Sequence, residues 1–251
     1  SRKECVMRPV EKWNPENEPR INDNYPNYKD AKHPLCMNLG TICSYCEKAY
    51  DDERDLQVEH IQPKKYKDAD GNYIYAHLET AWSNFLLSCP TCNGADNKDT
   101  KNVVYGSCHL PHLNNTFLSL SYKAGGVVEV NPSLSGKSAN NARALLELVG
   151  LNKGPKDSSA KDYRWRIRLE KWNLANIYLE KYIAGSVDIY TIVDLVKGHG
   201  CWSIWFTVFK GHDEVRKALI EEFPGTAASC FDAQNHFEPI CRNPLDDEDP
   251  V

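Results

Sequence analysis

Apolar and polar residues follow two different periods along this chain of 251 residues. Residues 117–122 and 127–130 alternate apolar with polar side chains around a Gly-Gly turn, which predicts a β-hairpin. Residues 47–58 are predicted to form a loop and then a strand. The remaining periodic segments have helical spacing and predict helices over 35–40, 77–88, 139–150, 161–184, 186–197 and 213–223. The pattern therefore predicts an α+β protein that is mainly helical.

The pattern also divides the chain into three regions. Residues 1–34 are rich in Pro, Asn and Asp without an apolar period, which predicts an extended arm. Residues 35–152 hold the paired cysteines, the hairpin and one helix, and the Gly-Pro and Ser-Ser pairs in 151–160 indicate a boundary. Residues 153–251 are predicted to be a helical region that binds a partner.

Two segments of the third region stand out. Residues 201–210 are strongly apolar, so we expect them to be buried or to pack against a partner protein. Residues 246–249 are acidic, which predicts a disordered tail.

Composition and charge limit the possible functions. The hydrophobic content of 41% and charged content of 26% are typical of a soluble globular protein. The sequence shows neither a membrane-spanning run nor a signal-peptide pattern, so we expect a reducing, cytoplasmic location in which the ten cysteines are metal ligands or free thiols. A net charge of −5 argues against binding nucleic acid without help, so we expect a partner to deliver the substrate.

Two Cys-x-x-Cys pairs carry the clearest chemical signal. Cys43 and Cys46 form the first pair, and Cys89 and Cys92 form the second. Two intervening residues let the backbone turn back, so that both thiolates of a pair approach one tetrahedral zinc ion. We therefore predict a structural zinc site that uses all four sulfurs and leaves the chemistry to other residues. The alternative is four ordinary buried thiols.

The segment between and after these pairs resembles the HNH endonucleases. The resemblance is carried by Glu59-His60 followed by Pro-Lys, and by Asn84 and Asn93 around the second cysteine pair. It implies a hairpin and a helix folded over one divalent ion. It also implies that His60 is the general base, that Glu59 and Asn93 are metal ligands, and that Asn84 restrains the histidine loop. The last motif position is Asn93 where many members have His, so the chain is an HNN variant.

The chemistry of phosphodiester hydrolysis needs these residue types. A water must lose a proton, and a positive charge must balance the developing charge on phosphorus. A histidine is neutral near pH 7 and accepts a proton. The oxygen donors of Glu59 and Asn93 suit Mg²⁺ or Mn²⁺ better than Zn²⁺, and Asp96 or Asn97 is a candidate third ligand.

Basic residues near the motif are candidate substrate contacts. Lys64 and Lys65 follow the Glu-His pair, and Lys98 follows the second cysteine pair. Arg164 and Arg168 belong to the only basic stretch of the chain, which is either a nucleic-acid contact or a solvated helix face. Residues 108–112 contain a Cys and two His at a spacing that is less typical of a second metal site.

Residues 7–152 resemble more narrowly the PtuB nuclease subunits of Septu-type anti-phage systems, some of which are attached to retrons. This resemblance implies an SMC/ABC-like ATPase partner of the PtuA type, a nucleic-acid substrate and, in some systems, a retron RNA–DNA complex. It favours a nuclease that cuts DNA. Cleavage of RNA, such as tRNA, by the same chemistry stays open, as does a zinc-bound adaptor without catalysis.

Overall fold

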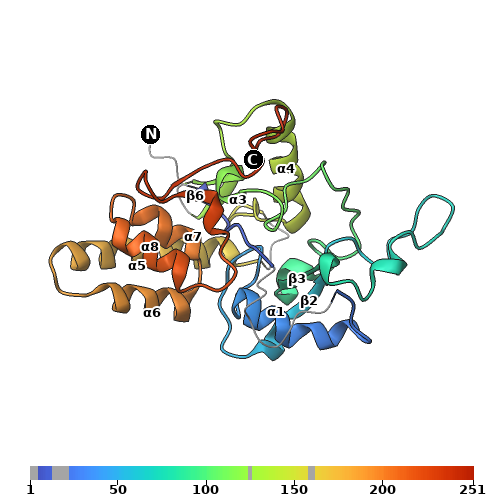
Figure 1. Ribbon diagram of the computed structural model, residues 1–251, viewed down its shortest axis with the longest axis horizontal. Helices are drawn as coiled ribbons and strands as arrows, with labels where there is room; N and C mark the ends of the chain where they lie inside the picture. The colour runs from blue at the N-terminus through green and yellow to red at the C-terminus, as the bar shows by residue number, and fades with distance from the viewer. Residues whose placement is uncertain (1–4, 13–22, 124–125, 158–161) are drawn as a thin grey trace.

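The computed structural model describes residues 5–12, 23–123, 126–157 and 162–251, and it confirms the predicted α+β class (Figure 1). Parts of the predicted arm, the hairpin turn and the boundary segment, at 13–22, 124–125 and 158–161, lie outside the described residues. The strands are β1 (Cys5–Val6), β2 (Gln57–His60), β3 (Phe85–Ser88), β4 (Leu120–Lys123), β5 (Val127–Val130), β6 (Phe231–Asp232) and β7 (Glu238–Pro239). The α-helices are α1 (Lys32–Leu39), α2 (Pro90–Asn93), α3 (Thr116–Ser119), α4 (Gly136–Val149), α5 (Arg164–Ile183), α6 (Ile189–His199), α7 (Trp202–Val208) and α8 (Asp213–Glu221).

Strands β2 and β3 and helix α2 form the small unit that carries the Glu-His pair and the second cysteine pair. β2 pairs antiparallel with β3, so that His60 lies opposite Phe85 and Glu59 opposite Leu86. Because α2 begins two residues after β3 and packs against β2, the second cysteine pair lies beside the Glu-His pair. The tertiary fold thus brings the two halves of the motif together.

The predicted helix over 77–88 is wrong. The chain there forms two 3₁₀ turns, Ala76–Leu78 and Trp82–Asn84, and then enters β3. The residues of β3 are all buried. A short apolar run fits a buried strand as well as a helix, and pairing with β2 satisfies its backbone.

A second sheet has the strand order β1-β4-β5. β4 and β5 confirm the predicted hairpin, although residues 116–119 form α3 rather than the start of the strand. Helix α4 packs against β5 and ends at Gly150, whose φ of 60° is the left-handed conformation that glycine adopts without steric cost. The predicted helix end at Gly150 is therefore confirmed, as is the end of α1 at Gly40.

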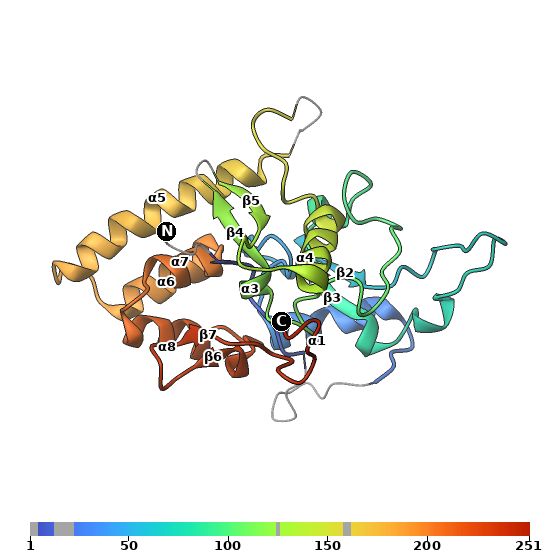
Figure 2. The ribbon, with the colours of Figure 1, turned by 90° about the horizontal axis from the view of Figure 1, so that it is seen from above.

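The helices α5 to α8 lie together at one end of the molecule (Figure 2). The predicted apolar segment forms α7 and is buried, with Trp202, Trp205 and Phe206 at 0% exposure. α5 packs against α7, and α6 packs against α8. The helix predicted over 186–197 begins later than expected, because the Asp188 side chain caps α6 by accepting the bond from the Thr191 backbone N–H at 2.8 Å.

The predicted disordered tail is also wrong. Asp249 and Val251 are buried, and the carbonyl of Val251 accepts a hydrogen bond from the Asn115 N–H at 2.7 Å. The carboxylate of Asp249 accepts hydrogen bonds from Ser138 and Asn141. An acidic residue with this many donors gains more from pairing than from hydration.

Glu47, directly after the first cysteine pair, joins three parts of the chain. Its carboxylate accepts hydrogen bonds from the Arg8 N–H at 2.7 Å and from the Ser203 hydroxyl at 2.5 Å. Its carbonyl accepts a bond from the Cys201 N–H at 2.8 Å.

One hydrophobic core runs from Val6 to Phe231 across the predicted boundary after residue 152. The division into three regions stays a prediction.

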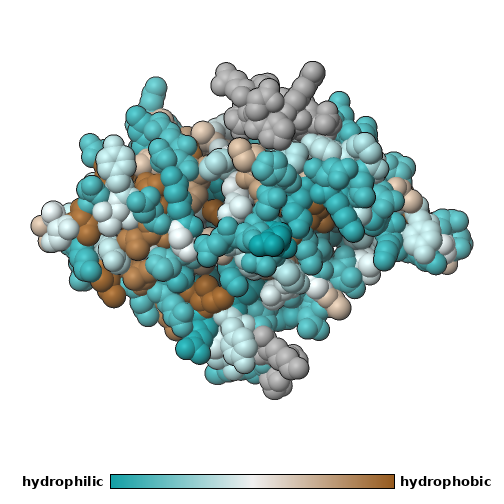
Figure 3. Space-filling model, turned by 90° about the horizontal axis from the view of Figure 1, so that it is seen from below, coloured by the Kyte–Doolittle hydropathy of each residue, from teal (hydrophilic) through white to brown (hydrophobic). Residues whose placement is uncertain are grey.

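The surface differs between the two ends of the molecule. Seen from below, apolar side chains gather over the helical end, while the opposite end is mainly hydrophilic (Figure 3). Among the described residues, every helix is too short or too polar to cross a lipid bilayer.

Candidate functional site

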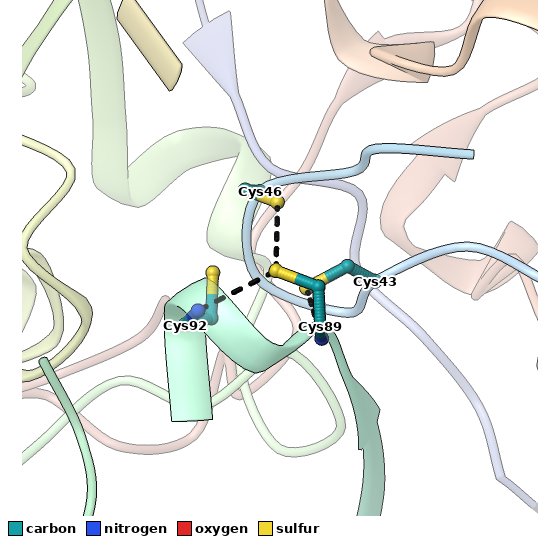
Figure 4. Close-up of side chains that lie close together, drawn as sticks. All are labelled: Cys43, Cys46, Cys89 and Cys92. Atoms are coloured by element: carbon teal, nitrogen blue, oxygen red, sulfur yellow. Dashed lines mark hydrogen bonds between the residues drawn. The ribbon is translucent and has the colours of Figure 1, made fainter. Parts of the chain in front are cut away.

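The four predicted zinc ligands meet in one place. The sulfurs of Cys43, Cys46, Cys89 and Cys92 all lie within 4.8 Å of one another and are buried (Figure 4). Four sulfurs about 2.3 Å from one tetrahedral zinc ion are about 3.8 Å apart. The separation of 3.7 Å between the Cys46 and Cys89 sulfurs matches this value and is far too long for a disulfide. The donor set therefore fits zinc.

Backbone N–H groups hold the sulfurs in this arrangement. The Cys89 N–H donates to the Cys43 sulfur at 3.3 Å, and the Cys92 N–H donates to the Cys89 sulfur at 3.4 Å (Figure 4). The second bond exists because Cys89 is the N-cap of α2, where a backbone donor lacks a partner within the helix. Such bonds stabilise negative sulfur and favour metal binding.

Arg164 and Arg168 lie inside the protein, so the predicted nucleic-acid contact by these two residues is wrong. Arg164 is 6% exposed and donates to the Cys92 sulfur at 3.0 Å and to the Gly150 carbonyl at 2.9 Å. Arg168 is 3% exposed and donates to the carbonyls of Gly126 and Leu151. A guanidinium has five donors, which lets it join several loops at once. Arg164 supports the cysteine cluster instead.

His60 is half-buried at the end of β2. Its Nε2 lies 2.8 Å from the Glu79 carbonyl oxygen. Because a carbonyl only accepts, Nε2 carries the proton and Nδ1 carries the lone pair in the neutral ring. Burial lowers the pKa of His60, and the nearby Lys64 ammonium acts in the same direction. The imidazole is therefore neutral near pH 7, with Nδ1 as the free base.

Asn84 binds the backbone of the loop that follows His60. Its Oδ1 accepts from the Gln62 N–H at 2.8 Å, and its Nδ2 donates to the Gln62 carbonyl at 3.0 Å. The Ile61 N–H donates to the Asn84 carbonyl at 2.9 Å. The side chain is 1% exposed, so these bonds cannot easily exchange with water. The arrangement restricts the segment immediately after His60.

Glu59 points to the opposite face of β2 and is paired with a lysine. Its Oε1 lies 2.5 Å from the Lys98 ammonium nitrogen, and the two side chains are 1% and 0% exposed. Lys98 also donates to the His60 carbonyl at 2.8 Å. Burial raises the pKa of the Glu59 carboxyl to about 7, against the opposing effect of Lys98. The predicted substrate contact by Lys98 is wrong, because its side chain is inaccessible.

The position of Lys98 bears on the predicted catalytic cation. The Lys98 ammonium already neutralises the buried Glu59 carboxylate, so a divalent ion at Glu59 has to displace it. Asn93 extends from the end of α2, and its amide nitrogen donates to Gln57 Oε1 at 3.0 Å. Gln57 and Glu59 lie on one face of β2, because side chains two apart in a strand share a face. This oxygen-rich face suits a hard cation, which at Glu59 has to compete with Lys98.

The candidate third ligands lie elsewhere. Asn97 is 1% exposed, and its amide joins the Thr91 carbonyl to the Lys153 ammonium. Asp96 is exposed, and its carbonyl accepts from Lys153. Helix α2 ends at Asn93, so no continuous helix places Asp96 or Asn97 one turn beyond Asn93 on the same face. The geometric argument for a third ligand at these positions is therefore lost.

Three contacts of His60 were not predicted from the sequence. Tyr28 packs edge-on against the imidazole at 4.9 Å between ring centres, and Phe85 does so at 5.3 Å. Glu79 provides the carbonyl, while its carboxylate binds Lys64 at 2.5 Å. Lys64 and Lys65 remain near the surface, at intermediate and high exposure respectively. All three contact residues are remote from His60 in sequence, and the pairing of β2 with β3 places Phe85 opposite His60.

His109 belongs to a closed polar network and not to a metal cluster. Its Nε2 lies 2.9 Å from Asp249 and its Nδ1 lies 2.7 Å from the Ser119 hydroxyl. Among the described residues, the four cysteines are the only group of three or more His, Cys, Asp or Glu positioned to hold a metal. The weaker hypothesis of a second metal site at residues 108–112 is therefore not supported.

A strand pair that ends at His60 and a short helix that carries the second cysteine pair lie together, with the four-cysteine cluster beside them. Residues 43–99 match the family described as HNH endonuclease. The chain therefore carries an HNH endonuclease domain.

Two named relatives share part of the sequence. A Vibrio cholerae (serotype O1 biovar El Tor) protein, named as an HNH endonuclease of retron Vc95, is 30% identical over 132 residues, which cover 50% of this chain and 57% of that protein. The Septu protein PtuB of Bacillus mycoides (strain KBAB4) is 33% identical over 79 residues, 29% of this chain and 27% of that protein. The chain thus matches little more than half of the first relative and about a quarter of the second.

Proposed function

We propose that this protein is a metal-dependent nuclease subunit of an anti-phage defence complex, with His60 as the general base that activates water. The observation that carries the proposal is the bond from His60 Nε2 to the Glu79 carbonyl. This bond fixes the tautomer and leaves Nδ1 able to accept a proton. Asn84 restrains the adjoining loop and so maintains the orientation of the ring.

We propose two metal ions with different roles, one structural and one catalytic. The cysteine cluster holds a structural zinc ion, because all four ligands are sulfur and no position is left for a reacting water. Glu59 and Asn93 are the proposed ligands of Mg²⁺ or Mn²⁺, which would have to displace Lys98 from Glu59 before its positive charge could stabilise the phosphate during hydrolysis. We expect chelation to stop cleavage before zinc loss unfolds the domain.

DNA is the proposed substrate, because the chain carries the domain of the HNH endonucleases. RNA is the alternative, since attack of water on phosphorus does not require a particular sugar. The relatives named for a retron and for the Septu system support a role in defence. The net charge of −5 supports delivery of the substrate by a partner, for which an SMC/ABC-like ATPase of the PtuA type is the proposed candidate and a retron RNA–DNA complex a further one.

The test compares His60→Ala with the unchanged protein in a cleavage assay with DNA and RNA and either Mg²⁺ or Mn²⁺. We expect the rate to fall by about 10²- to 10⁴-fold, the usual contribution of a general base. His199→Ala, at the end of α6, is the matched control and should retain full activity. If only RNA is cleaved, RNA and not DNA is the substrate.

A non-catalytic adaptor is the competing function. It predicts that His60→Ala leaves defence against phage intact when the protein is made with its partners. Loss of defence while the variant remains folded and in complex would exclude the adaptor. Equal cleavage by His60→Ala and His199→Ala would instead reject the role of His60.

A further inference from the structure

A projecting loop begins just after His60 and carries tyrosines and lysines. We call residues 64–75 the tyrosine finger. It is the teal loop that extends from the nuclease end of the molecule in Figures 1 and 2. Lys67 and Tyr73 form an antiparallel bridge, and the Asp68 carboxylate accepts hydrogen bonds from the N–H groups of Asp70 and Asn72 at the tip. These bonds give the finger a defined shape.

The finger exposes aromatic and apolar surface next to a neighbouring segment. Tyr73 is 53% exposed, and Ile74 is also exposed. The Tyr75 hydroxyl donates to Asn102 at 2.9 Å, which places the finger beside Val104 and Tyr105, two further exposed residues. Four of the large hydrophobic side chains exposed on the described part of the molecule therefore gather here, and single exposed residues rarely cluster without a binding partner.

Positive charge accompanies these rings. The Lys67 ammonium lies 4.6 Å from the centre of the Tyr73 ring, and Lys64 lies 3.8 Å from the Tyr28 ring. Lys65, which lies between Lys64 and Lys67 in the sequence, is exposed. Asp68 is engaged in the turn at the tip, so its charge is partly satisfied within the finger. The finger thus places ammonium groups beside two rings, Tyr73 and Tyr28.

The base of the finger is connected to the candidate catalytic residue. Gln62, two residues after His60, donates from its side chain to the Val103 carbonyl at 3.0 Å, and Asn84 holds its backbone. Lys64 binds the carboxylate of Glu79, whose carbonyl binds His60. A ligand on the finger would therefore extend toward the imidazole.

We infer that the tyrosine finger binds unpaired nucleotides and that the substrate of the His60 site is single-stranded nucleic acid. A base stacks on the exposed face of Tyr73 while Lys65 and Lys67 contact phosphates. Exposed rings favour single strands, because in a duplex the faces of the bases are covered by stacking on their neighbours. The inference deepens the proposed nuclease function and rests on it for the role of His60.

The test measures binding of a fluorescent single-stranded oligonucleotide of about 12 nucleotides, a length within the usual site size. All variants are made in the His60→Ala background, so that cleavage does not interfere. We expect Tyr73→Ala to weaken binding about tenfold, since one base–ring stack contributes about 1–3 kcal/mol. Tyr73→Trp should restore binding, because a larger ring still stacks. Lys67→Gln should weaken binding and reduce its dependence on salt concentration.

Tyr190→Ala is the matched control, because Tyr190 is 79% exposed on α6, at the helical end. Unchanged affinity of Tyr73→Ala for the single strand would overturn the inference. An equal loss of affinity for duplex and single strand would also overturn it. If the finger binds a partner protein instead of nucleic acid, Tyr73→Ala will leave the affinity for the single strand unchanged.

Failure of the finger and failure of the catalytic proposal are separable. With His60 restored, Tyr73→Ala should raise KM for a single-stranded substrate and leave kcat nearly unchanged. If His60→Ala cleaves normally, the catalytic proposal fails while the binding assay still tests the finger. If His60→Ala is inactive but Tyr73→Ala has an unchanged KM, the finger inference fails alone.

Discussion

At the scale of residues, the buried ion pair between Glu59 and Lys98 is the main feature that the motif did not reveal. Glu59 has the identity and position of a cation ligand, yet its charge is met by an ammonium group within the protein. Lys98 lies after the second cysteine pair, and its N–H donates to the Cys92 carbonyl at 3.1 Å. The pair thus joins the cysteine framework to the strand that ends at His60.

Replacing Lys98 with Met should lower the free energy of unfolding by about 3–5 kcal/mol, because the carboxylate of Glu59 would stay buried without a partner. Urea denaturation measures the change. Adding Glu59→Gln to Lys98→Met should recover part of the loss, since the remaining group is neutral. The exposed Lys101→Met is the control and should change stability by less than about 0.5 kcal/mol. Similar effects of both lysine variants would contradict a stabilising pair.

Arg164→Met should destabilise the protein by about 3–5 kcal/mol and speed the release of zinc to a chelator. The buried guanidinium donates to the Cys92 sulfur and pairs with Asp162, whose side chain is 10% exposed. Arg166→Met on the same helix is the matched control, because its pair with Glu170 is exposed. We expect an effect below about 0.5 kcal/mol there. Equal zinc release from the two variants would show that Arg164 does not support the cluster.

At the scale of elements, local pattern predicted helices better than short strands. The ends of α1 and α4 were correct, because a glycine after an apolar face ends a helix through local backbone geometry. Leu78, Trp82 and the pair at 85 and 86 recur at helical spacing, so the local pattern predicts a helix where residues 85–88 form β3. Pairing with β2 decides between these structures, and that pairing joins residues 25 to 31 positions apart.

Gly200→Ala should test the contact between the helical end and the cysteine loop. Gly200 has a φ of +69°, and a Cβ there would lie 2.4 Å from the Glu47 carbonyl oxygen and 2.6 Å from the Ala49 nitrogen. Gly200 has a ψ of −156°, and Gly40 lies in the same backbone region, with a φ of +77° and a ψ of 166°. Gly40 has open space around it, so Gly40→Ala measures the backbone cost alone. We expect Gly200→Ala to lose about 1–3 kcal/mol more stability in thermal or urea denaturation. Equal losses of stability in the two glycine variants would show that the contact between Gly200 and the cysteine loop does not stabilise the protein.

At the scale of the whole molecule, the last residues of the chain close a polar network with His109. Asp249 binds His109, Ser138 and Asn141, three residues that come from the segment before α3 and from α4. Because these groups are buried, the acidic end is held to the nuclease half and is not a free tail. The network should respond to pH.

Stability should fall as the pH falls below about 6.5, the ordinary pKa of histidine. Burial lowers the pKa of His109, although Asp249 acts in the opposite direction. The pKa of Asp249 is also lowered, because hydrogen bonds from Ser138, His109 and Asn141 outweigh the effect of burial. The unfolded chain therefore binds more protons than the folded chain, so acid favours unfolding.

Urea denaturation between about pH 8 and pH 5 measures this dependence. His109→Gln removes the titrating group and should reduce the fall in stability over that range, while the buried His112 retains its own contribution. His33→Gln is the control, since His33 is exposed. An equal pH dependence in His109→Gln and the unchanged protein would contradict the assignment.

The sequence by itself determined the chemistry that depends on neighbouring residues: the α+β class, two Cys-x-x-Cys pairs and a Glu-His pair typical of HNH endonucleases. Their spacing is local, so it survives without knowledge of the fold. Only the tertiary structure decided which charges are buried and with what partner. Lys98 meets Glu59 and Arg164 meets Cys92, while Asp249 meets His109 across 140 positions. Packing selects such pairs, because burying a charge is costly unless an opposite charge or a donor is brought beside it.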